Sequence, residues 1–248
     1  MISRRLATLL PDGDDGWGLY RRATALAAQG RPVTMLTIGE HDRPTAPGIL
    51  DAMDRAARAG HTGYAPISGN PELRQAVADR VTRRTGVRTG PENVVITPGG
   101  QAGLFAAHLA ALDPGDSALF VDPYYATYPG TIRGADALPR AVVTGPETGF
   151  LPTEPALEAQ AAGARSLLVN TPNNPTGRVY DAATLEGIAR VCRRHGLWLI
   201  SDEVYESQVW HGSHLSPRAI PGMAERTLVV GSMSKSHAMT GSRLGWVV

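Results

Sequence analysis

From about residue 94 the chain alternates short apolar runs with stretches of helical length, and this alternation constrains its fold more than any other feature. We expect strands at five of the apolar runs: 94–97, 118–121, 166–170, 197–201 and 227–231. Helices are predicted from the turn at 98–102 to about residue 112, for about eight residues ending near Gly163, and over 181–195. Strands that alternate with helices in this way predict a mostly parallel sheet with helices on both faces. The expected fold is therefore α/β, in three layers, αβα.

The first 93 residues follow a less regular pattern. Residues 14–29 read as a helix with Asp14 or Asp15 as its N-cap, and 33–38 read as a strand. A loop over 39–47 leads into a proline-started helix at 47–59, and Asn70 is placed to cap a further helix. We divide the chain into an N-terminal helix and strand segment, 1–45, and a large domain, 46–248.

Polar or glycine-rich segments follow several of the predicted strands. In open α/β sheets ligands bind outside the carboxyl ends of the strands. Pro98-Gly-Gly-Gln-Ala102 joins a strand to a helix N-terminus, where free N–H groups favour an anion. Asp202 follows the strand at 197–201. Each feature also has an ordinary interpretation, because many Gly-Gly turns only connect elements and many such aspartates are N-caps or loop residues.

Lys235 is the only lysine among 24 basic residues. A lysine amine can lose its proton when desolvated and attack a carbonyl, whereas a guanidinium stays charged. A lone lysine in an Arg-rich chain can equally be a solvated surface residue. Its surroundings, Gly231-Ser-Met-Ser-Lys-Ser-His-Ala-Met-Thr-Gly-Ser-Arg-Leu-Gly245, add hydroxyls, an arginine and glycine turns. This setting suits an anionic cofactor that carries a carbonyl group.

The segment 231–245 resembles the lysine motif of the class I and II pyridoxal-phosphate (PLP) aminotransferases, which have fold type I and are aspartate-aminotransferase-like. The resemblance extends over residues 15–248 and includes Asn174-Pro-Thr-Gly177. It implies the PLP-binding large domain of that fold. It also implies an enzyme that moves an amino group between an amino acid and a 2-oxo acid through a Schiff base on Lys235.

The resemblance also assigns a role to each candidate site residue. Lys235, Asp202 and Tyr205 would be catalytic: Asp202 would pair with the pyridine nitrogen, and Tyr205 would donate to the ring hydroxyl beside Asn174. The phosphate group would be held by Gly100, Gln101, Ala102, Ser232 and Arg243. Tyr125 would stack on the ring, Tyr64 would reach the partner subunit's phosphate in a homodimer, and Gly39 would meet the substrate carboxylate.

Two positions depart from the family pattern. His41 stands where a proline is usual, so the resemblance does not define the shape of the loop after Gly39, and Ser242 replaces a common tryptophan. Tyr64 and Tyr125 can also be read as packing or surface tyrosines, and Gly39 as a plain turn residue. We expect no effect of Ser242 on cofactor binding.

Composition narrows the class of partner. The net charge is +1, which implies no nucleic-acid partner, and no apolar run approaches the roughly 20 residues that span a bilayer. The single cysteine, Cys192, lies on an apolar helix stripe and fits a buried position in a cytoplasmic protein. No metal site is expected.

The chain ends at Val248 within an apolar run. Members of the family continue well beyond this point, so we expect a C-terminally truncated chain in which most of the small domain is missing. The arginine that usually binds the substrate carboxylate would then lie outside the chain. Two alternatives stay open: a PLP-dependent β-lyase or related enzyme of the same fold, and a non-catalytic fragment. The amino donor is not identified by these motifs.

Overall fold

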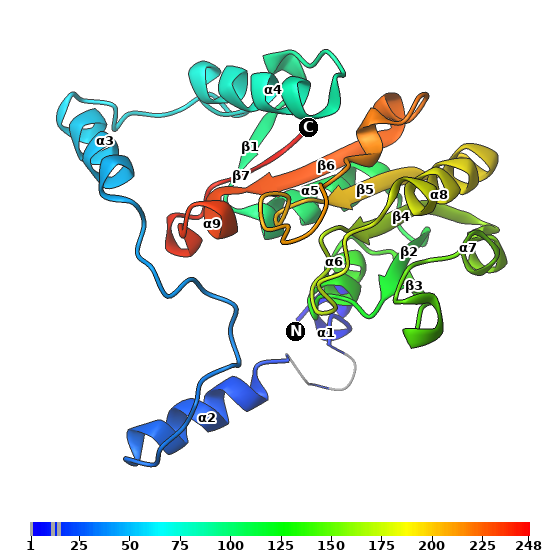
Figure 1. Ribbon diagram of the computed structural model, residues 1–248, viewed down its shortest axis with the longest axis horizontal. Coiled ribbons are helices and arrows are strands. Elements are labelled where there is room, and N and C mark those ends of the chain that lie inside the picture. Colours follow the sequence, from blue (N-terminus) through cyan, green and yellow to red (C-terminus); the bar gives the residue numbers. More distant parts are fainter. Residues whose placement is uncertain (1, 11–12, 14–15) are drawn as a thin grey trace.

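A seven-stranded sheet organises the molecule (Figure 1). The computed structural model describes residues 2–10, 13 and 16–248. The strands are β1 (Val95–Thr97), β2 (Ser117–Asp122), β3 (Leu138–Val143), β4 (Ala164–Asn170), β5 (Trp198–Asp202), β6 (Thr227–Ser232) and β7 (Gly245–Val247). Their order across the sheet is β1-β7-β6-β5-β4-β2-β3. Neighbouring strands from β6 to β3 run parallel, and β7 runs antiparallel to both of its neighbours. The predicted mostly parallel sheet is confirmed.

Helices cover both faces of the sheet. The helices are α1 (Arg4–Ala7), α2 (Gly18–Ala28), α3 (Pro47–Arg58), α4 (Pro71–Thr85), α5 (Gly100–Ala111), α6 (Tyr128–Gly134), α7 (Glu154–Ala161), α8 (Ala182–His195) and α9 (Met233–Ser236). α5 and α6 pack on one face through a cluster that includes Leu104, Ile132 and Ile200. α7 and α8 pack on the other face, around Leu167 and Leu199. The three-layer αβα expectation is therefore confirmed.

Side-chain alternation along the strands decides which face each residue covers. In β5, Leu199 belongs to the α7/α8 cluster and Ile200 to the α5/α6 cluster. Val229 of β6 and Trp246 of β7 pack with Val77 and Val81 of α4. Because successive side chains in a strand point to opposite faces, near-continuous apolar strands are expected when both faces are covered. Cys192 is fully buried in the α7/α8 cluster, as its helical stripe indicated.

The N-terminal part of the chain differs from its prediction at three points. Residues 33–38 form no strand: they are irregular, with a bend at 37–38, and no described strand pairs with them. A strand needs a hydrogen-bonding neighbour, so apolar alternation alone was not sufficient. The helix predicted at 14–29 is observed as α2, from Gly18 to Ala28, and the predicted caps Asp14 and Asp15 lie outside the described residues. Asn70 occupies the N-cap position of α4, but its side chain makes no capping hydrogen bond.

Further along the chain, α6 was not predicted. It begins at the last tyrosine of Tyr124-Tyr-Ala-Thr-Tyr128 and contains Pro129 and two glycines, which are unfavourable in helices. Burial of Tyr128 and Ile132 against the sheet stabilises it instead. After β3, a 3-10 turn covers Pro146–Thr148, and α7 begins at Glu154.

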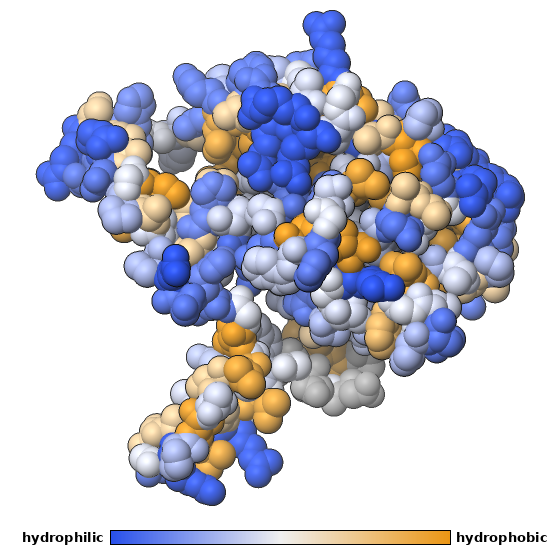
Figure 2. Space-filling view, viewed as in Figure 1, coloured by the Kyte–Doolittle hydropathy of each residue, from blue (hydrophilic) through white to orange (hydrophobic). Residues whose placement is uncertain are grey.

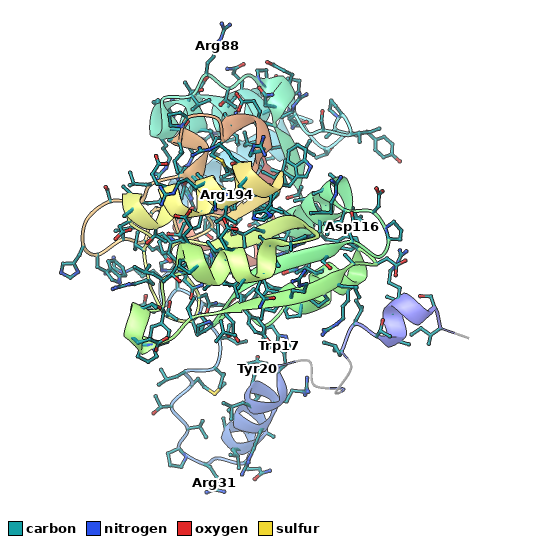
Figure 3. The ribbon with its side chains drawn as sticks, turned by 90° about the vertical axis from the view of Figure 1, so that its right-hand side faces the viewer. Trp17, Tyr20, Arg31, Arg88, Asp116 and Arg194 are labelled. Atoms are coloured by element: carbon teal, nitrogen blue, oxygen red, sulfur yellow. The ribbon has the colours of Figure 1, made fainter. Side chains whose placement is uncertain are left out.

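The N-terminal arm, which we define as residues 16–70, stands away from the sheet over most of its length (Figure 1), and near its end the Ser68 carbonyl accepts a 2.9 Å hydrogen bond from Ile96 of β1. It carries α2, an extended segment and α3. Figure 3 shows Trp17 at the end of α2 nearest the sheet, with Arg31 beyond the far end of that helix. Apolar residues gather on the arm's surface, including Leu19, Leu36 and Met53, and Figure 2 shows the apolar colouring over α2. None of the described helices is long and apolar enough to cross a membrane.

Candidate active site

The predicted site residues come from different strands and meet at one edge of the sheet. β2, β4, β5 and β6 are linked in one parallel ladder, so their carboxyl ends lie on the same edge. Tyr125 follows β2, Asn174 follows β4, Asp202 ends β5 and Ser232 ends β6. This is the position at which doubly wound folds place their ligands.

Asp202 is the buried carboxylate of the site, with 4% of its surface exposed. Its Oδ2 accepts a 2.7 Å hydrogen bond from the hydroxyl of Tyr128, and its Oδ1 accepts one of 3.3 Å from the Val204 amide. Burial raises the pKa of Asp202 to about 6, and these two hydrogen bonds act in the opposite direction. A buried carboxylate of this kind gains most from a positively charged partner.

Tyr128 was missed as a functional residue. It lies three residues after Tyr125, but no role was assigned to it from the sequence. Its ring is buried and lies edge-on to Tyr125, with ring centroids 5.8 Å apart. Its contact with Asp202 joins residues 74 positions apart, which a local pattern does not reveal. Burial raises the pKa of Tyr128 well above its usual value, so its hydroxyl stays a donor to the carboxylate.

The expected phosphate cradle is assembled around the start of α5. Gly99 has a φ of +82°, and a Cβ there would lie 2.3 Å from Nη2 of Arg243. A Cβ on Gly100 would lie 3.8 Å from the Cβ of Ser232. The helix start, the arginine and the serine therefore surround one position, with only glycine tolerated between the helix and the guanidinium. Arg243 itself has a left-handed φ of 51° and donates to the Thr240 carbonyl at 2.7 Å.

Gln101 fixes this cradle to the neighbouring helix. Its Nε2 donates to the hydroxyl of Thr131 at 2.7 Å, and its Oε1 accepts from the hydroxyl of Thr127 at 2.8 Å. Both threonines belong to α6 or its N-cap. The side chain of Gln101 therefore holds the first turn of α5 against α6, and its backbone N–H, with that of Ala102, is left at the open helix end.

Asn174 and Tyr205 lie together as predicted. Nδ2 of Asn174 donates to the Tyr205 hydroxyl at 3.4 Å. The Asn174 amide donates to Oδ1 of Asn170 at 2.7 Å, and Nδ2 of Asn170 donates to the Asp202 carbonyl at 3.0 Å. Asn170 thus connects the turn after β4 to the end of β5. Burial raises the pKa of Tyr205, which keeps this phenol protonated at neutral pH.

Lys235 lies at the same edge, in the short helix α9 that follows β6. Its Nζ is 6.0 Å from the ring centroid of Tyr205 and donates to the Gly39 carbonyl at 2.6 Å. Burial lowers the pKa of Lys235; the negative charge of Glu40 opposes this effect and Arg243 adds to it. Desolvation beside a guanidinium favours a neutral, nucleophilic amine.

The loop at Gly39 is tied to the lysine segment by residues that the sequence left uncertain. Nε2 of His41 lies 2.6 Å from the Lys235 carbonyl, and the hydroxyl of Thr240 donates to Glu40 at 2.8 Å. The hydroxyl of Thr45 donates to the Ala238 carbonyl at 2.7 Å. His41 therefore anchors the loop with its side chain at the position where the resembled family has a proline.

Two of the predicted tyrosines have different surroundings. Tyr125 is partly exposed at the mouth of the site, and burial followed by the charge of Asp202 raises its pKa. Tyr64 lies on the arm between α3 and α4 and is fully exposed. The structure does not bring Tyr64 together with the other predicted residues of this chain.

The residues at this edge fit pyridoxal phosphate on structural grounds. The cradle at Gly99 and Arg243 offers backbone N–H groups and a guanidinium, which suit a phosphate group. Asp202 offers a buried negative charge for a protonated pyridine nitrogen. Lys235 offers an amine with a lowered pKa.

The family model for aminotransferase class I and II matches residues 31–248. The chain belongs to this family. Members of the family are in general PLP-dependent, which agrees with the donor groups described above.

Similar proteins include named transaminases of different specificity. The aspartate/prephenate aminotransferase of Thermus thermophilus is 40% identical over 247 residues, 99% of this chain and 63% of the relative. The arginine–pyruvate transaminase of Pseudomonas aeruginosa is 39% identical over 238 residues, 96% of this chain and 61% of the relative. The chain thus spans about three fifths of the length of these relatives.

Solved structures of aminotransferases share the fold. The Thermus thermophilus aspartate aminotransferase with maleate superposes with a TM-score of 0.94 at 38% identity, covering 100% of this chain and 64% of the other. An aromatic aminotransferase from Pyrococcus horikoshii gives 0.83 at 34% identity, covering 85% and 57%. The αβα fold of this chain is therefore that of the PLP fold type I large domain, as its motifs predicted.

Proposed function

We propose that the protein is a PLP-dependent aminotransferase that moves an amino group between an amino acid and a 2-oxo acid. The observation that carries the proposal is the convergence of Lys235, Asp202 and the Gly99–Arg243 cradle at one sheet edge. PLP, when bound, supplies an aldehyde that takes up the amino group and a ring that stabilises negative charge. The remaining tasks fall to the side chains of this chain.

Binding and orientation come first. The backbone of Gly100, Gln101 and Ala102 would hold the phosphate, together with Ser232 and Arg243. The ring would lie against Tyr125, with Asp202 at its nitrogen and the Asn174–Tyr205 pair at its hydroxyl. The hydrogen bond from Tyr128 lowers the pKa of Asp202, which favours the carboxylate over the acid.

Proton movement is assigned to Lys235. Its amine, freed from the cofactor by the substrate, would accept the proton that leaves the substrate α-carbon. The lowered pKa of Lys235 increases the fraction of neutral amine that can accept this proton. The Gly39 carbonyl, 2.6 Å away, orients this amine. The loop at Gly39 would also meet the substrate carboxylate.

The exposed apolar surface of the arm supports a second subunit as the partner of this chain. Its exposed apolar residues, among them Leu36, Met53 and Ile67, lie on surfaces that a second subunit would cover. We assign a homodimer in which Tyr64 reaches the partner subunit's phosphate. In this scheme residues 1–45 belong to the interface and small-domain part, and 46–248 form the PLP-binding large domain. The single buried cysteine is consistent with action in the cytoplasm.

Cofactor trapping tests the function directly. The purified protein is mixed with PLP, its visible absorbance is recorded, and the mixture is reduced with borohydride before peptide mapping. We expect an absorbance band and a pyridoxyl group on Lys235, and neither in Lys235→Arg. Labelling of the N-terminal amine alone would contradict the proposal.

Substrate incubation then separates the two reaction types. Amino acids are supplied with a 2-oxo acid acceptor, and the products are identified. Transfer of nitrogen to the acceptor is expected. Release of ammonia and a thiol from cysteine-type substrates, without transfer, would indicate a β-lyase instead.

A further inference from the structure

Asp202 and Glu203 are consecutive carboxyl groups at the end of β5, and both are buried, with Glu203 only 3% exposed. Successive side chains point to opposite faces of a sheet. Asp202 contacts Tyr128 on the α5/α6 side, where the cofactor is proposed to bind. Glu203 instead meets Ser216 of the following loop, and α4 lines the same small cavity. The proposed aminotransferase chemistry gives no role to Glu203.

The two oxygens of Glu203 have unlike surroundings. Oε1 accepts hydrogen bonds from the hydroxyls of Ser201 at 2.9 Å and Ser216 at 2.7 Å. Oε2 faces Nε2 of His214 at 3.8 Å, and no described residue donates to it. The glutamate amide donates to the Val230 carbonyl at 2.9 Å, which holds the backbone in place.

His214 presents a lone pair to this oxygen. Its side chain is 2% exposed, its Nε2 has no hydrogen-bond partner among the described residues, and its ring is hydrogen-bonded to the backbone of Thr171. The nitrogen that donates to a backbone carbonyl carries the ring hydrogen, so the other nitrogen is an acceptor. Burial lowers the pKa of His214 to about 4, so the ring is neutral at physiological pH. Two acceptors therefore face each other at 3.8 Å.

Either a metal ion or a proton can separate two such acceptors. Glu203, Glu206 and His214 offer atoms within 4.8 Å of one another, which is a spacing that a cation can use. However, Arg80 and Arg84 both form ion pairs with Glu206. The two carboxylates of this buried site already face two guanidinium groups. A divalent ion would add two positive charges there, whereas a proton adds only one, so the proton is favoured.

We propose that Glu203 is a neutral carboxylic acid whose Oε2 hydrogen is donated to Nε2 of His214, forming a buried acid–imidazole pair. A carboxyl rotation that shortens the separation by about 1 Å makes a normal hydrogen bond. Burial raises the pKa of Glu203 to about 8, and the serine hydroxyls, with Arg84, act against this rise. The negative charge of Glu206 adds to it. The charge of Glu203 also acts on the pKa of Arg218, but the guanidinium of Arg218 donates its hydrogen bonds to Ala224 and Thr89.

The pair acts as a positioning device for the cofactor edge. It ties β5 to the loop that carries His214 and, through Thr171, to the turn that carries Asn174. A neutral Glu203 also leaves Asp202 as the single negative charge at the end of β5. This second consequence rests on the proposed function, because it matters only if Asp202 pairs with a protonated ring.

Stability measured as a function of pH tests the proton directly. Glu203→Gln replaces the neutral acid with an amide that can donate to His214 and accept from both serines. The free energy of unfolding of the wild-type protein and of this variant is measured by denaturant titration from pH 5 to pH 9. Glu72→Gln, on the exposed surface of α4, is the matched control.

The expected result has a definite sign. The folded pKa of Glu203 lies above its unfolded value, so its contribution is complete below the unfolded pKa and is lost as pH rises through about 8. The ratio of the wild-type unfolding constant to that of Glu203→Gln should therefore rise by roughly tenfold per pH unit between about pH 5 and pH 8, then level off. The Glu72→Gln ratio should stay flat over the same interval.

A pH-independent ratio for Glu203→Gln would overturn the proposal, since it would mean an ionised Glu203. Failure of this variant to fold would overturn it too, because the amide reproduces the donor and acceptor pattern of the neutral acid. The stability readout needs no cofactor. If the predicted ratio is found but the protein takes up no PLP, the acid–imidazole pair is supported and the aminotransferase function is contradicted.

Discussion

α3 and α8 are amphipathic helices of 12 and 14 residues, yet they differ in what they bury. α8 buries six residues against the sheet, including Leu185 and Ile188. α3 buries none, and its Leu50 and Met53 are exposed. The apolar stripe of α8 is satisfied within the chain, whereas that of α3 is not. An amphipathic pattern therefore predicts that a face will be covered, but not which chain covers it.

The same contrast separates the sheet body from the N-terminal arm. The body holds its functional groups in buried hydrogen-bond networks, such as Tyr128–Asp202. The arm reaches the site through the contacts of its loop with Lys235 and leaves most of its apolar surface open. We expect substitutions in the body to change catalysis and folding, and substitutions on the arm to change association. Four predictions test this division, ordered by expected effect.

The largest effect is expected at Asp202. Asp202→Asn removes the buried negative charge while keeping the shape of the side chain, so the ring nitrogen would lose its counter-charge. By analogy with the loss of one preorganised electrostatic partner, kcat should fall by at least roughly 10²–10³-fold. Steady-state kinetics with saturating PLP measure this. Glu72→Gln, on the exposed surface of α4, is the control, and an equal fall in kcat there would contradict the special role of Asp202.

A core truncation should be the next largest. Leu167→Ala in β4 removes a fully buried side chain between the sheet and α8, and such cavities cost about 2–5 kcal/mol. Urea titration gives the change in the free energy of unfolding. A loss below about 1 kcal/mol would show that this layer is not the well-packed core described here.

Tyr128→Phe is expected to have a smaller effect with a distinct pH signature. The variant removes the 2.7 Å hydrogen bond to Asp202, and hydrogen bonds to charged groups contribute about 1.5–3 kcal/mol. Since this bond lowers the pKa of Asp202, its loss should raise that pKa above about 6. The acidic limb of the kcat/KM profile should move to higher pH, and its position is the measurement. An unshifted acidic limb would mean that the Tyr128 hydroxyl does not influence the pKa of Asp202.

Most of the sheet and the edge that carries the site followed from local sequence. Strands such as β4 and β5 are continuous apolar runs because both faces are covered, and Asp202 stands directly after one of them. The contacts that escaped prediction join distant residues, as Tyr128 to Asp202 and His214 to Glu203 do. The strand expected at 33–38 failed for a related reason. Its pattern is local, but a strand depends on a neighbour that no described segment provides.

The smallest effect on folding is expected for a substitution on the arm, and it tests the contrast between the arm and the sheet body. Leu36 is 88% exposed, so Leu36→Ala should change the free energy of unfolding of the isolated subunit by no more than about 0.5 kcal/mol. If a second subunit covers this surface, the same substitution should weaken self-association, because it removes apolar area from the interface. Sedimentation at several concentrations measures the association, and Arg31→Ala, at an exposed polar position of the arm, is the control. A large loss of subunit stability would place Leu36 in the core of one chain. Unchanged association would mean that the apolar surface around Leu36 is covered by something other than a second copy.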